Sequence, residues 1–185
     1  MDVYATSRGR SLYHPLAGLS RSMCGITATV MMVGIAGCSN LLTNDYRATA
    51  VTTYVWQVEY TGESDRPYDR RIQRFASTSL ENVDGIMPDA AVGNADDQGL
   101  WWPALPPRPT VDELEAGQKR GERIGTPEII KQVDYTLSFY QDGQQQTLPA
   151  NYSVYRQAVK AIEDDRPLEL TLGPAEQSVQ KAEIR

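Results

Sequence analysis

The clearest structural signal in the sequence is Val133-Asp134-Tyr135-Thr136-Leu137-Ser138-Phe139, in which apolar and polar residues alternate at every position. Successive side chains of a β-strand point to opposite faces of the sheet, so this period predicts a strand with one buried face. Asp142-Gly143 follows as a hairpin turn signal, and residues 144–148 form the predicted return strand. The segment therefore predicts antiparallel pairing.

The chain before this hairpin contains a second strand pattern. Residues 51–61 also alternate, and they are rich in the β-branched and aromatic residues that strands favour. One predicted face carries Tyr54, Trp56, Val58 and Tyr60. After a turn over residues 62–67, residues 68–76 are predicted to form the hairpin partner of this strand.

The chain after the hairpin changes its period. Tyr152, Tyr155, Val159 and Ile162 recur at helical spacing, which predicts an amphipathic helix over residues 152–163. Residues 168–172 alternate again, and residues 179–184 are predicted to add a last strand. Strands grouped around short helices, without a βαβ rhythm, indicate the α+β class. We expect a mostly antiparallel sheet of about four to six strands with two short helices.

The middle of the chain, residues 77–109, is predicted to be a long loop rich in proline and glycine. Turn-forming residues interrupt it too often for a regular element. It ends in residues 100–109, where four prolines impose an extended path. Thr110 and Glu113 then match a capping box, which predicts a helix of about a dozen residues.

The first 37 residues have the composition of an export signal. Arg8, Arg10 and Arg21 supply positive charge, and residues 23–37 form an apolar run that ends in small residues. This run has 15 residues, fewer than the roughly 20 that a membrane-spanning helix needs. Its end, Ile35-Ala36-Gly37-Cys38, has the pattern of a lipobox. The segment resembles the signal peptide of bacterial lipoprotein precursors.

The resemblance implies cleavage between Gly37 and Cys38, with a diacylglyceryl group on the Cys38 sulfur and usually palmitate or another acyl chain on its amine. Two or more acyl chains give stable membrane anchoring. Ser39 stands where an Asp would favour inner-membrane retention, so the same resemblance favours the periplasmic face of the outer membrane. Residues 38–46 would then be a lipidated tether, and residues 47–185 a single domain.

Removal of this leader limits the available chemistry. His14 and Cys24 would leave with it, so the remaining chain has no histidine and Cys38 as its only cysteine. That composition excludes an internal disulfide, Cys/His zinc sites and nucleophilic mechanisms with a histidine base. We therefore predict no catalytic residue, no metal and no cofactor besides the covalent lipid.

The charge balance argues against nucleic acid as a partner. The leader carries three Arg and one Asp, so the rest of the chain holds 15 basic and 23 acidic residues, a net charge of −8. Nucleic-acid binding relies on Lys and Arg to neutralise phosphates, so an acidic domain is a poor candidate.

Two charged segments are candidate ion sites. Arg66, Arg70, Arg71 and Arg74 fall within nine residues and form either an anion-binding patch or a solvated strand face. Residues 94–99 place oxygens at alternate positions before a glycine, as calcium loops do. However, Leu105 stands at the twelfth position, where such loops need a bidentate Glu. The alternative for this segment is a solvated acidic loop.

Residues 100–109 are the best candidate for binding a partner. Trp101, Trp102 and Leu105 form an apolar cluster on a proline-stiffened backbone, with Arg108 beside them. Trp is enriched at binding hot spots, and a stiff segment loses less entropy when it binds. The alternative is that both tryptophans close over the sheet as part of a crossover connection.

Three functions are compatible with these observations. The predicted one is a membrane-anchored envelope lipoprotein with a non-catalytic role, which binds or scaffolds another envelope protein. The second is an accessory or assembly subunit of a membrane complex. The third is an envelope hydrolase that uses paired carboxylates, since Asp and Glu remain when His and Cys are gone.

Overall fold

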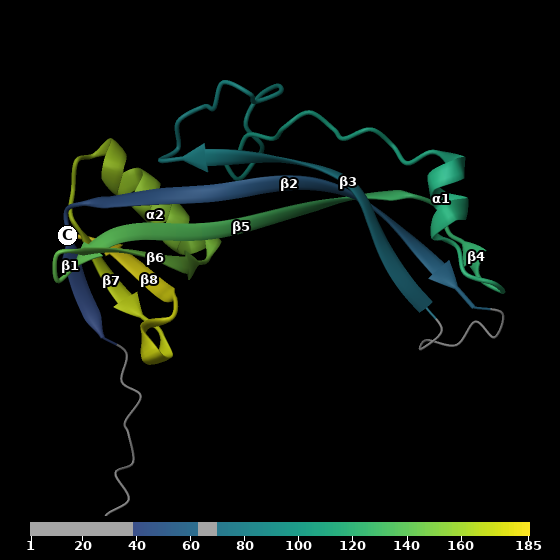
Figure 1. The fold of residues 1–185 in the computed structure, drawn as a ribbon. Coiled ribbons are helices and arrows are strands. Elements are labelled where there is room, and N and C mark those ends of the chain that lie inside the picture. The colour runs from purple at the N-terminus through teal and green to yellow at the C-terminus, as the bar shows by residue number, and fades with distance from the viewer. Residues whose placement is uncertain (1–38, 63–69) are drawn as a thin grey trace, which may run out of the picture. The chain divides into compact units, whose positions relative to one another are not determined.

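The structure, a computed structural model, describes residues 39–62 and 70–185. These residues form two helices and two mostly antiparallel sheets of three and five strands, so the predicted α+β class is confirmed (Figure 1). The strands are β1 (Asn40–Thr43), β2 (Tyr46–Thr61), β3 (Arg70–Val83), β4 (Arg123–Ile124), β5 (Glu128–Gln141), β6 (Gln144–Ala150), β7 (Leu168–Leu172) and β8 (Val179–Ile184). The helices are α1 (Val111–Gly117) and α2 (Tyr152–Glu163), with a short 3₁₀ turn, η2 (Pro174–Glu176).

β2 lies inside the larger sheet, whose strand order is β3-β2-β5-β6 with β4 paired to the end of β2. Its 16 residues span roughly 50 Å at about 3.4 Å per residue. β5 pairs with β2 from Tyr46 to Gln57, and β4 continues along the same edge at Tyr60. β3 pairs with the opposite edge. Every position of the predicted alternation in β2 therefore lies within a paired strand.

One face of β2 is covered by three segments in turn. α2 packs over Ala48 and Ala50 near the start of β2. α1 packs over Val58 and Tyr60 near the end of β2. Residues 100–109, which we call the crossover, cover the positions between them. These positions are Thr52, Tyr54 and Trp56. Figure 1 shows the connection from β3 running back along the strands to α1.

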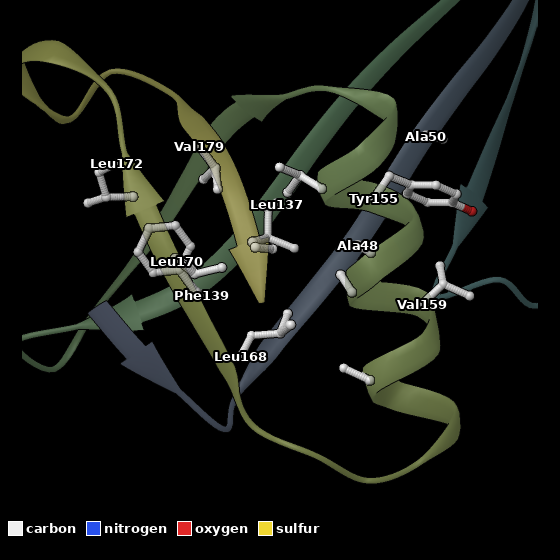
Figure 2. Packing of buried hydrophobic residues seen from close by; sticks show 14 of the residues in the cluster. Ala48, Ala50, Leu137, Phe139, Tyr155, Val159, Leu168, Leu170, Leu172 and Val179 are labelled. Carbon is white, nitrogen blue, oxygen red and sulfur yellow. The ribbon is translucent and has the colours of Figure 1, made fainter. Parts of the chain in front are cut away.

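The main hydrophobic core lies between α2, the smaller sheet β1-β7-β8, the first part of β2 and the last part of β5. Figure 2 shows side chains from these elements pointing toward one another. Leu168, Leu170 and Leu172 are fully buried on one face of β7, as their alternation predicts. Burial of each such side chain contributes about 1.5–3 kcal/mol. Burial also raises the pKa of the Tyr155 hydroxyl to about 12, so this ring stays neutral in the core.

A second, smaller cluster holds α1 on the far end of the sheet. Leu114 of α1 packs against Val58 and Tyr60 of β2, and the Tyr60 hydroxyl donates a hydrogen bond to the Leu114 carbonyl. The predicted capping box is present, because the Thr110 hydroxyl accepts from the Glu113 amide and the Glu113 carboxylate accepts from the Thr110 amide.

Three elements have the bounds that the sequence predicts, namely α2, β7 and β8. Others differ. β3 extends to Val83, so the predicted loop over residues 77–109 begins only at Asp84. α1 has seven residues instead of about a dozen, because Arg71 binds the Gly117 carbonyl and Gln118 is extended. Within residues 38–46, the predicted tether, the structure forms β1 and the first residue of β2.

Candidate functional site

The crossover is fixed to the sheet by a buried asparagine. Asn82 of β3 is fully buried, and its amide nitrogen donates to the Trp101 carbonyl at 3.1 Å. Its amide oxygen accepts from the Trp101 backbone N–H at 2.8 Å. The Thr52 hydroxyl donates to the same carbonyl at 2.8 Å. The backbone of Trp101 is thereby paired as it would be with a neighbouring strand.

The Trp102 ring is enclosed between the backbone of the crossover and the sheet. It packs on Tyr54 with ring centroids 4.8 Å apart, and Lys131 Nζ lies 4.8 Å from its centroid. Its Nε1–H donates to the Asp96 carboxylate at 2.8 Å, so its one polar atom has a partner. Only 8% of Trp102 is exposed.

The two tryptophans therefore close over the sheet as part of a crossover connection, which was the alternative to a partner-binding edge. Trp102 is buried and Trp101 is half-buried, so neither offers the exposed ring that a partner-binding edge needs. Their sequence neighbours differ, since Leu105 is 62% exposed and Arg108 is exposed. Of the four predicted partner-binding residues, Leu105 and Arg108 are the ones accessible from outside.

The crossover backbone beneath these exposed residues is held to the sheet by hydrogen bonds. The Trp56 Nε1–H donates to the Pro106 carbonyl at 3.0 Å, and the Thr78 hydroxyl donates to the Ala104 carbonyl. The Arg108 guanidinium lies 5.8 Å from the Trp56 ring centroid. Val111, at the start of α1, is 66% exposed. The crossover and the start of α1 thus present exposed apolar side chains, and the crossover backbone beneath them is hydrogen-bonded to the sheet.

The three arginines of the predicted patch that the structure describes do not share one face of the sheet. Arg66 lies outside the described residues. Arg70 and Arg74 share the exposed face of β3, where Arg70 lies 3.6 Å from Glu59, whereas Arg71 points to the covered face. Side chains alternate along a strand, so the adjacent residues Arg70 and Arg71 cannot point the same way.

Arg71 instead clamps α1 and the following turn onto the sheet. Its guanidinium forms a bidentate pair with Glu122, at 3.2 Å from Nε to Oε1 and 2.7 Å from Nη2 to Oε2. The ring centroid of Tyr60 lies 4.4 Å from the guanidinium carbon. The hydrogen bond between the partners lowers the pKa of Glu122 and raises the pKa of Arg71, so both stay charged at neutral pH. Protein groups accept from four of the five N–H donors of Arg71, so it has little capacity left for an external anion.

The acidic loop uses its central carboxylate internally. Asp96 Oδ1 accepts from the backbone N–H groups of Gln98 and Leu100, at 3.0 and 2.9 Å, while its Oδ2 accepts from Trp102. These bonds turn the chain into the crossover and leave the carboxylate little capacity for calcium. Within residues 39–62 and 70–185, no group of three His, Cys, Asp or Glu side chains lies close enough to hold a metal ion.

Sequence reasoning missed Asn82 as a key residue. A signal was present, because Leu80 and Asn82 lie two apart and therefore on one face of any strand. A polar residue on the same strand face as a buried leucine indicates that a backbone N–H or C=O group lies against that face and needs a hydrogen-bond partner. That backbone belongs to Trp101, whose position the sequence did not reveal.

Gly37 and Cys38, the predicted cleavage and lipidation residues, lie outside the described residues, which begin with Ser39 and then with β1 at Asn40. Among the helices that the structure describes, none is long and apolar enough to cross a bilayer. No family model, curated protein or solved structure matches this chain.

Proposed function

We propose that this chain is an exported lipoprotein, anchored to the bacterial envelope by lipid on Cys38, which binds or scaffolds another envelope protein without catalysing a reaction. The observation that carries the proposal is the lipobox pattern Ile35-Ala36-Gly37-Cys38 at the end of an apolar run, two residues before the start of β1 at Asn40. The chain after the lipobox contains no histidine and no second cysteine, which supports a non-catalytic role.

The outer side of the crossover, together with the start of α1, is the proposed partner-binding surface. Leu105 and Val111 are both more than 60% exposed, and Arg108 lies between them in the sequence. Exposed apolar residues on a rigid backbone favour binding, because little entropy is lost when the partner docks. The Trp56 and Thr78 hydrogen bonds to the crossover supply that rigidity.

The anchor is tested by Cys38→Ser. This variant should be released from membranes or remain as an unprocessed precursor, because no sulfur is left to carry the diacylglyceryl group. Cys24→Ser is the matched control, since Cys24 lies in the leader outside the lipobox and its loss should change nothing. Membrane fractionation and intact mass are the measurements. A wild-type protein without acyl mass on Cys38 would contradict the proposal.

The binding surface is tested by Leu105→Asp. A carboxylate pressed against an apolar partner loses its water without a compensating bond, which weakens binding by on the order of 2 kcal/mol, about thirtyfold. The matched control is Ile72→Asp, because Ile72 is 60% exposed on β3, outside the crossover. Chemical crosslinking in intact cells should join the wild type and Ile72→Asp to the same envelope protein, and Leu105→Asp should lose that product. Equal crosslinking by all three proteins would rule out this surface.

A further inference from the structure

Ser39, the residue next to the proposed lipid site, is fixed to the fold through both its backbone and its side chain. Its carbonyl accepts a hydrogen bond from the Leu172 amide at 2.9 Å, which extends the β1–β7 ladder by one step. Its hydroxyl donates to Glu176 Oε1 of η2 at 2.8 Å. Asn40 already pairs with Thr171 in β7. The residue that is covalently bonded to Cys38 is therefore held in place by β7 and η2.

These two hydrogen bonds of Ser39, which we call the clamp, remove the freedom of movement that a flexible tether would give the domain. Consecutive Cα atoms lie about 3.8 Å apart, so Cys38 cannot move far from Ser39. An eight-residue tether could instead extend to almost 30 Å and let the domain turn freely. Lipid on Cys38 must then hold one particular end of the domain next to the headgroups.

We propose that the Cys38 lipid orients the domain on the bilayer, with η2 and the turn between β5 and β6 against the lipid surface and α1 at the distal end. This inference rests on the lipidation proposed above. It adds the face that meets the membrane and the end that points away from it.

The two turns lie together at the anchored end. A shallow cavity of about 320 Å³ is lined from both sides, by Asp142 and Gln144 of the hairpin and by Ala175 and Glu176 of η2. Most side chains at this end are small or uncharged, and Glu176 is already bonded to Ser39. Such a surface suits contact with polar headgroups and lacks the apolar bulk that would insert deeply.

The strand register shows which elements lie at the opposite end of the larger sheet. Tyr46 of β2 pairs with Phe139 close to the hairpin turn, whereas Tyr60 pairs with Ile124 beneath α1. The 14 steps from Tyr46 to Tyr60 correspond to about 48 Å along the strand. The crossover lies over the strand between these ends. An anchored domain would thus hold Leu105 clear of the headgroups, where another envelope protein can reach it.

The orientation can be measured with the full chain, expressed with its leader and reconstituted in phosphatidylcholine vesicles that contain a nitroxide-headgroup lipid. Once Cys24 is removed and the Cys38 sulfur is acylated, an introduced cysteine is the only free thiol for a fluorophore. Suitable exposed positions are Gln177→Cys beside η2, Gln144→Cys at the hairpin and Arg120→Cys after α1. Fluorophores at positions 177 and 144 should lose most of their emission, whereas one at position 120 should keep it.

A matched variant tests the clamp itself. Ten Gly and Ser residues inserted between Cys38 and Ser39 add an average reach of about 17 Å, so the difference between positions 177 and 120 should disappear. If acyl mass is present but the three positions are quenched equally, the orientation is wrong and the lipoprotein proposal stands. If the insertion leaves the contrast unchanged, the Cys38 lipid does not orient the domain through Ser39, and this inference is overturned while the lipoprotein proposal stands. If acyl mass is missing, the proposed function fails, and the orientation fails with it.

Discussion

Asn82→Asp should produce one of the largest losses of stability in this domain. The Asn82 amide nitrogen faces three oxygens, the Ala50 carbonyl and the Thr52 hydroxyl at 3.2 Å and the Trp101 carbonyl at 3.1 Å. An Asp of the same shape would replace that donor with an oxygen in a fully buried position. An uncompensated buried charge costs about 3–5 kcal/mol, and many domains have only 5–15 kcal/mol in total.

Urea unfolding followed by circular dichroism measures this effect as a lower midpoint at an unchanged slope. Asn94→Asp is the matched control, because it makes the same chemical change at an exposed residue of the connection that follows β3. It should change the free energy of unfolding by no more than about 0.5 kcal/mol. Equal midpoints for the two variants would mean that Asn82 does not hold the crossover to the sheet.

The elements that could be predicted to the residue are those whose signal is local. α2 buries one face at helical spacing, from Val154 and Tyr155 to Val159, against a single core. β7 alternates buried leucines with partly exposed polar residues. In both cases the hydrophobic period of the segment matches the surface that it covers, so its own residues contain the necessary information.

The end of β3 was missed because what covers it is a loop backbone and not an apolar core. Thr78 and Asn82 donate hydrogen bonds to carbonyls of the crossover, so polar residues occupy the covered face where a strand pattern needs apolar ones. β1 was missed for a related reason. Its four residues become a strand only by pairing with β7, which lies more than 120 residues later in the chain. Neither partner is visible from the local sequence.

Of the candidate sites, the arginine cluster was open to correction from sequence alone. Residues 68–76 were predicted as a strand, and strand geometry separates the neighbours Arg70 and Arg71. The burial of Trp102 was less accessible to prediction. It depends on Asp96, which turns the loop and accepts from the indole nitrogen, and on Lys131 from a strand that follows later in the chain.

Gly85→Ala should be the second large loss. Gly85 follows β3 with a φ of +71°, a conformation that costs an L-residue about 1–2 kcal/mol. A Cβ there would also lie 2.5 Å from Val159 Cγ1 of α2, and forced overpacking of this kind adds about 1–3 kcal/mol. The neighbouring Asp84 cannot shift easily, because it exchanges hydrogen bonds with the Ala48 backbone. The combined loss is about 2–5 kcal/mol.

Gly143→Ala separates the two contributions, since Gly143 has a φ of +77° but no atom within 4 Å of its added Cβ. It should lose only the backbone cost, about 1–2 kcal/mol. Adding Val159→Ala to Gly85→Ala removes the clash, so the double variant should lose less stability in urea unfolding than the sum of its single variants. Equal losses for both glycine variants, with additive behaviour in the double variant, would show that α2 tolerates a side chain at position 85. The contact between the β3 turn and α2 would then be looser than the 2.5 Å approach requires.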